Sequence, residues 1–162
     1  MLLSGHTANS ELAMAKHFDF QFGLTEIVPA KQDEREGQRV AIFRQLVNDT
    51  LKAEALKPNI FPSKKDIFVA AIQFYSSETD YKTRDVDNIS KTILDCLKGK
   101  LYIDDSQVCT ILISKRFNKR VPNNFIFVGV REINGDTDIE VVKIMLFEQA
   151  VTMYQQSATR KQ

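Results

Sequence analysis

The run from Asp66 to Tyr75 constrains the fold most strongly, because it is apolar on both of its alternating faces. A strand of this kind must be covered on two sides, which is typical of the interior of a sheet. Its fully apolar part, Ile67 to Ile72, is far shorter than the roughly 20 residues that span a bilayer. The chain therefore needs other strands beside this one and helices to cover them.

The patterns on either side supply those elements. Phe18 to Phe22 alternates apolar and polar residues, which predicts a half-buried strand. A charged stretch, residues 31–37, separates it from a helix whose apolar stripe is Val40, Phe43, Val47, Leu51 and Ala55. A polar loop over 76–83 precedes a second helix, Asn88 to Lys98, with Asp87 as N-cap and Gly99 as the residue after its end. Strands are predicted over 107–117 and 125–132, followed by an Asn134-Gly135 turn.

The tail carries Ile139, Val142, Leu146, Ala150 and Met153 at helical spacing, which predicts an amphipathic helix to about residue 156. Strands and helices alternate irregularly, so we expect an α+β fold with a mixed sheet packed by helices. A length of 162 residues fits a single domain. We expect its core over about 18–132 and a C-terminal helical extension over about 138–157.

Composition excludes several classes of protein. The formal net charge is +1, so the overall charge gives no hint of nucleic acid or membrane. No secretory signal is visible, and Cys96 and Cys109 form neither a disulfide framework nor a zinc site. The glycine-rich phosphate-binding motifs G-x-x-x-x-G-K and G-x-G-x-x-G do not occur in the sequence, so no nucleotide cofactor is expected. The sequence predicts a cytoplasmic protein with no membrane partner.

The segment from Arg84 to Asp105 carries the residues most suited to chemistry. Asp85 and Asp87 lie two apart in an extended approach to the second helix, so their side chains share a face. That helix rises about 16 Å, and six extended residues after Gly99 span about 20 Å. The doublet Asp104-Asp105 is therefore expected to return beside the start of the helix. Because the two are adjacent, at most one faces the cluster squarely.

Carboxylates gathered in this way repel one another unless a cation lies among them. Oxygen ligands suit Mg²⁺ first, with Mn²⁺ as a second possibility. Lys91 lies one turn after Asp87 on the same helical face, where it is able to neutralise a phosphate. The alternative for Asp87 alone is a simple helix cap.

Basic residues gather around this segment. Residues 81–120 hold nine Lys or Arg and five Asp, a local net charge of +4. A carboxylate pocket ringed by cations fits a polyanionic substrate that also binds metal. The expected DNA-binding residues are Lys82, Arg84, Lys115, Arg116, Lys119 and Arg120. The alternative for residues 115–120 is a solvated hairpin tip.

These motifs have a known counterpart. Arg84-Asp85-Val86-Asp87-Asn88, Lys91 and Asp104-Asp105-Ser106-Gln107 closely resemble the RusA family of Holliday-junction resolvases, small endonucleases common in bacteriophages and prophages. The resemblance implies a Mg²⁺-dependent homodimer that acts on four-way DNA junctions in recombination and repair. It implies Asp85, Asp87 and Asp105 as catalytic, metal-binding carboxylates, with Lys91 in support and the role of Asp104 open. The tail beyond residue 132 is longer, and the loop over 98–103 shorter, than the family pattern requires.

The sequence thus predicts a structure-selective endodeoxyribonuclease that resolves Holliday junctions by paired symmetric nicks. A two-fold dimer follows from the reaction, because one acidic cluster cuts one strand and resolution needs two opposed cuts. One alternative is a branched-DNA-binding protein that does not cleave. Another is an α+β protein whose acidic loop serves a protein partner.

Overall fold

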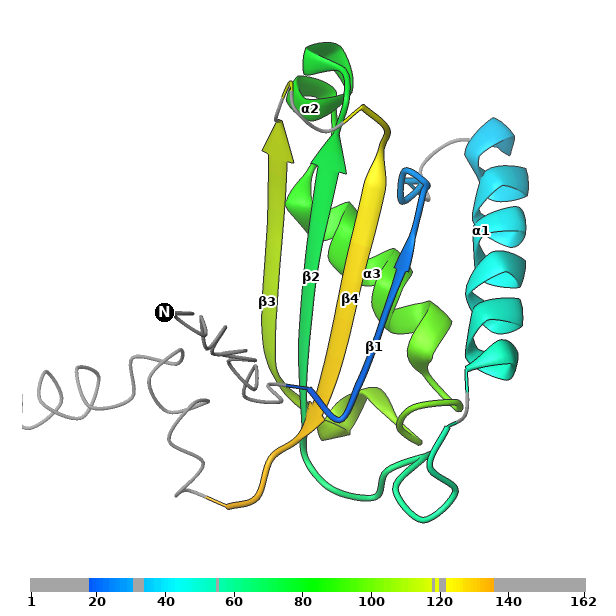
Figure 1. Ribbon diagram of the computed structural model, residues 1–162, viewed down its shortest axis with the longest axis vertical. Coiled ribbons are helices and arrows are strands. Elements are labelled where there is room, and N and C mark those ends of the chain that lie inside the picture. Colours follow the sequence, from blue (N-terminus) through cyan, green and yellow to red (C-terminus); the bar gives the residue numbers. More distant parts are fainter. Residues whose placement is uncertain (1–17, 31–33, 55, 118, 120–121, 136–162) are drawn as a thin grey trace, which may run out of the picture.

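The computed structural model describes residues 18–30, 34–54, 56–117, 119 and 122–135 of the chain. Their centre is a four-stranded sheet in the order β1-β4-β2-β3 (Figure 1). The strands are β1 (Phe20–Leu24), β2 (Ile67–Tyr75), β3 (Val108–Phe117) and β4 (Phe125–Glu132). β2 pairs antiparallel with β4 and parallel with β3. The sheet is therefore mixed, and the prediction that residues 66–75 form an interior strand is confirmed.

Three α-helices and a short 3₁₀ helix join the strands: α1 (Glu34–Ala53), α2 (Glu78–Thr83), α3 (Val86–Leu97) and η1 (Asp105–Gln107). α1 begins within the charged stretch predicted to be a connection, since Glu and Arg are good helix formers. α2 replaces the predicted loop over 76–83. Its start is capped by Ser77, whose side chain accepts a hydrogen bond from the amide of Asp80.

The main core lies between one face of the sheet and the two long helices. The apolar stripe predicted for α1 supplies Phe43, Val47 and Leu51, all buried. α3 supplies Ile89, Ile93 and Leu97 to the same cluster. Because β2 and β3 are parallel, α2 and α3 form the crossover between them. Figure 1 shows α3 running from α2 at one end of the sheet to the opposite end, where the chain turns into β3.

The second face of the sheet carries an aromatic layer of its own. Phe18 stacks on Phe68 with the ring centroids 6.2 Å apart and meets Phe127 edge to face. A Cβ at Gly129 would lie 2.6 Å from the Phe18 ring, so glycine is required for this close approach. Alternate residues of β2 are therefore buried on opposite sides, as the sequence pattern requires.

One polar side chain is fully buried in the sheet. Gln73 accepts a hydrogen bond from the amide of Val28 (2.9 Å) and donates to the carbonyls of Glu26 (2.9 Å) and Phe125 (3.1 Å). It thereby fixes the segment between β1 and α1 against β2 and β4. Buried polar groups are tolerated in proteins when they are satisfied in this way.

Replacing Gln73 with leucine is expected to lower the free energy of unfolding by about 3 kcal/mol, because it removes the hydrogen-bond partner of one amide and three carbonyls. Urea denaturation of the two proteins measures the change. Gln45→Leu is the matched control, since the bond from Gln45 to Asp49 is exposed and its loss should cost less than about 0.5 kcal/mol. Equal stability of Gln73→Leu and wild type contradicts this role.

The predicted C-terminal helix, residues 139–156, lies outside the described residues, as does the end of the predicted extension at 157. Among the helices that the structure does describe, none is long and apolar enough to cross a membrane.

Candidate active site at the two ends of α3

The first acidic pair lies at the N-terminal end of α3. Asp85, not Asp87 as predicted, is the N-cap residue, and its side chain makes no capping hydrogen bond. Asp87 is in the first turn, and both side chains are exposed. The positive end of the helix dipole favours carboxylates here. Asp85 thus presents a carboxylate that the helix itself does not use.

Lys91 has the position predicted for it, one turn after Asp87. Its ammonium lies 3.2 Å from the Asp87 carboxylate on the exposed face of the helix. The hydrogen bond from Lys91 lowers the pKa of Asp87, and its charge adds to the effect. Asp87 is therefore held in its ionised form, which is the form that accepts a cation or a hydrogen bond.

The acidic doublet lies at the other end of the helix. Lys98, the C-cap of α3, places its ammonium 2.9 Å from Asp104 and 3.0 Å from Asp105. These two carboxylates raise the pKa of Lys98.

The two aspartates of the doublet differ in what they do. Asp104 caps η1 by accepting hydrogen bonds from the amide (3.3 Å) and hydroxyl (2.8 Å) of Ser106. The hydrogen bonds from Lys98 and Ser106 hold the pKa of Asp104 well below its usual range. Both carboxylates thus face Lys98, and that of Asp104 also caps η1.

The prediction that the doublet returns to the start of α3 is wrong for the single chain. The segment after Gly99 folds tightly instead of extending: Leu101 and Tyr102 are buried, and the Tyr102 hydroxyl donates to the carbonyl of Leu94 (2.8 Å). This anchors the doublet at the C-terminal end of the helix, about 16 Å along the axis from Asp87. Among the residues that the structure describes, no three Asp, Glu, His or Cys side chains form a group able to hold a metal ion.

Lys115, predicted to bind DNA, is turned inward. Its ammonium donates to the carbonyls of Tyr81 (2.8 Å) and Arg84 (2.7 Å) and lies 4.9 Å from the centre of the Tyr81 ring. A lysine of β3 thereby fixes the end of α2 and the peptide that leads into Asp85. The sequence contains no signal for this role, because sequence alone does not distinguish a lysine that faces the protein from one that faces solvent.

A match to a known family decides the classification. The profile described as endodeoxyribonuclease RusA matches residues 35–129, from α1 to β4, which is more than half of the chain. The chain belongs to the RusA family. No curated protein matches it. Membership confirms the resemblance drawn from residues 84–107 and supports the class of enzyme, a nuclease that cuts within DNA.

The other basic residues of this RusA-family chain have varied surroundings. Lys82 pairs with Glu78 at 2.8 Å on exposed α2. Arg116 and Lys119 are exposed at the end of β3 and just beyond it. Arg120 lies outside the described residues. Arg84 lines a cavity beside the acidic end of α3.

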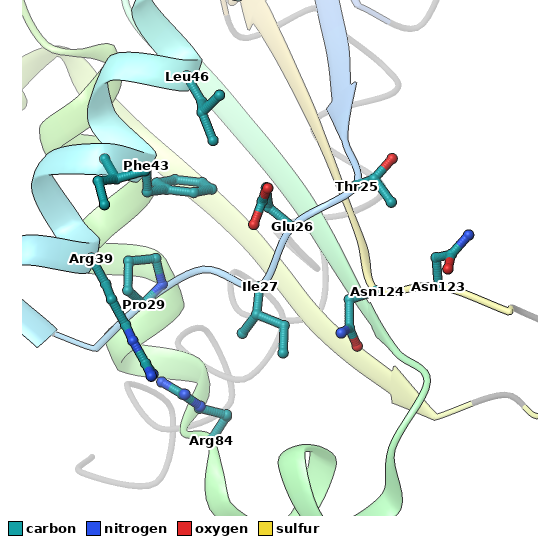
Figure 2. Close-up of a pocket in the computed structure, with 11 residues that line it drawn as sticks. Thr25, Glu26, Ile27, Pro29, Arg39, Phe43, Leu46, Arg84, Asn123 and Asn124 are labelled. Atoms are coloured by element: carbon teal, nitrogen blue, oxygen red, sulfur yellow. The ribbon is translucent and has the colours of Figure 1, made fainter.

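That cavity was not predicted from the sequence. It has a volume of about 440 Å³. It is lined by Thr25, Glu26, Ile27 and Pro29 after β1, by the middle of α1, by Arg84 and by the two residues before β4. Figure 2 shows the side chains of Arg39 and Arg84 pointing toward one another at one end of it. Its lining comes from four separate parts of the chain, which no local motif reveals.

Proposed function

We propose that this RusA-family protein resolves four-way DNA junctions by paired symmetric nicks, as a homodimer that depends on Mg²⁺ or Mn²⁺. The observation that carries the proposal is the placement of the acidic motif on two exposed ends of one helix, within a domain of the family. The basic residues near the end of β3 and before α3 supply charge of the sign that a DNA backbone requires.

One chain does not bring the carboxylates together, so a metal site requires a second copy. Two copies of α3 related by a two-fold axis and lying antiparallel would bring Asp85 and Asp87 of one copy to Asp105 of the other. Such an interface is self-complementary and yields two equal sites, as two opposed cuts require.

Two exposed apolar side chains support this arrangement. Val86, beside Asp85 and Asp87, is 37% exposed, and Ile103, beside the doublet, is 51% exposed. Large apolar residues at these places suit a contact between copies. In the antiparallel pair, Val86 of one copy lies at the same end as Ile103 of the other, so the contact and the site form together.

When bound, a hard divalent cation polarises a phosphoryl oxygen and stabilises the leaving oxygen. Carboxylates of Asp85, Asp87 and Asp105 are the donors that such an ion prefers. In the isolated chain Lys91 pairs with Asp87, and Lys98 pairs with both Asp104 and Asp105. These lysines reduce the repulsion among the carboxylates at each end of α3 before two copies associate.

The test is a nicking assay on a four-way junction made from oligonucleotides with each strand labelled in turn. We expect two nicks placed symmetrically across the crossover, present with Mg²⁺ and absent with EDTA. A linear duplex of the same sequence is the control and should stay intact. Junction binding without any metal-dependent nick would instead identify a binding protein that does not cleave.

A further inference from the structure

We propose that the cavity beside Arg84 binds one unstacked deoxynucleotide of the junction strand next to the cleavage site. This inference rests on the proposed function, because it takes DNA as the substrate. The cavity's volume of about 440 Å³ falls within the range of small-ligand pockets, roughly 300 to 1,000 Å³. Arg84 lines the cavity and directly precedes Asp85, so the cavity lies next to the acidic end of α3.

The wall of the cavity is held rigidly. Gln73 bonds the backbone of Glu26 and Val28, and the Thr92 hydroxyl of α3 donates to the carbonyl of Pro29 (3.0 Å). Both of these polar side chains are buried, and both hydrogen-bond the backbone of the segment that lines the cavity. A pocket fixed in this way loses little entropy when it takes up a ligand.

The chemistry of the lining differs from one end to the other. At one end the guanidinium groups of Arg39 and Arg84 suit a phosphate, which arginine binds in bidentate fashion (Figure 2). Apolar side chains of Ile27, Pro29, Phe43 and Leu46 line much of the rest, with Leu46 at the end far from the arginines (Figure 2). The carboxylate of Glu26 lies away from the arginine end, beside Phe43 (Figure 2).

This order of groups selects a nucleotide over a bare anion. A phosphate alone would leave the apolar part of the lining empty, whereas a base that carries its phosphate meets both the apolar side chains and the arginine end. Glu26 disfavours a second phosphate and is able to accept a hydrogen bond from a base amino group. Asn123 and Asn124 add amide groups from the two positions before β4. A base with its own phosphate would contact the two arginines, the apolar side chains and Glu26 together.

The experiment uses wild-type protein in EDTA and junctions with one nucleotide near the crossover replaced by 2-aminopurine or by an abasic analogue. At one position we expect a several-fold rise in 2-aminopurine fluorescence on binding. At that position the abasic junction should bind about tenfold more weakly, the effect of losing one base contact.

Ile42→Trp narrows the cavity without disturbing the core, because Ile42 lines it and is 57% exposed. This variant should lose both the fluorescence rise and the sensitivity to the abasic nucleotide. Ala41→Trp adds the same ring to an exposed neighbouring position outside the lining and should keep both. Arg39→Met should lower the slope of log affinity against log salt by about 0.9, as loss of one phosphate contact does.

The outcomes separate the two proposals. Junction binding in which Ile42→Trp behaves as wild type, or in which no position responds, overturns the nucleotide pocket alone. Failure of wild-type protein to bind any junction overturns the proposed function, and the pocket's substrate with it.

Discussion

Replacing Asp87 with asparagine is expected to slow junction nicking by about a thousandfold or more while junction binding is kept. The substitution preserves shape and removes the charge that a divalent ion requires. Loss of that interaction costs about 4 kcal/mol in the transition state, which corresponds to a thousandfold. Asp87 is exposed, so the fold should be unaffected. Asp105→Asn, at the other end of α3, should give a loss of the same size.

The rate is measured at saturating protein, so that binding does not limit it. Glu78→Gln is the matched control, because it removes an exposed helical carboxylate at the same end of the sheet. It should cut at the wild-type rate. Nicking by Asp87→Asn at the wild-type rate would show that the acidic motif has no part in cleavage.

Replacing Lys115 with methionine is expected to slow nicking at saturating protein by about a hundredfold. The variant keeps much of the side chain's bulk but releases the carbonyls of Tyr81 and Arg84. The peptide before Asp85 then shifts, and a displacement of about 1 Å in a site costs on that order. Because Lys115 faces inward, the salt dependence of junction binding should not change.

The salt dependence of junction binding distinguishes a Lys115 that positions the peptide before Asp85 from a Lys115 that contacts DNA. A lysine that binds phosphate contributes a slope of about 0.9 in log affinity against log salt. Arg116→Met removes the same charge from the neighbouring exposed position and should leave the rate at saturation unchanged. A slope lowered by about 0.9 in Lys115→Met, with a normal rate, would mean that Lys115 contacts DNA instead. Thermal melting of each variant confirms that the domain remains folded.

Helices and strands could be predicted from the sequence where their apolar residues follow a clear helical or strand pattern. Residues 66–75 are apolar on both faces and form the interior strand β2, and the stripe from Val40 to Leu51 forms the buried side of α1. The short helix α2 was missed because its residues are polar and none of them is buried. Only its cap, Ser77, carries a local signal.

The acidic residues were readable as a group, but their arrangement was not. The sequence-based interpretation treated the segment after Gly99 as extended. Leu101 and Tyr102 instead turn into the core at the end of α3, and Gln107 ties the doublet to the carbonyls of Ser63 and Lys65. Such long-range contacts decide position, and residue spacing does not contain them. The inward turn of Lys115 and the cavity beside Arg84 escaped prediction for the same reason.

The most direct test of the account is a mixed dimer of one Asp87→Asn chain and one Asp105→Asn chain, purified through two different tags. If each site takes Asp87 from one copy and Asp105 from the other, one site of the mixed dimer carries both substitutions and the other carries neither. We therefore predict that the mixed dimer nicks a single strand of the junction, although both parent proteins are inactive. A mixed dimer as inactive as its parents would contradict a site shared between copies.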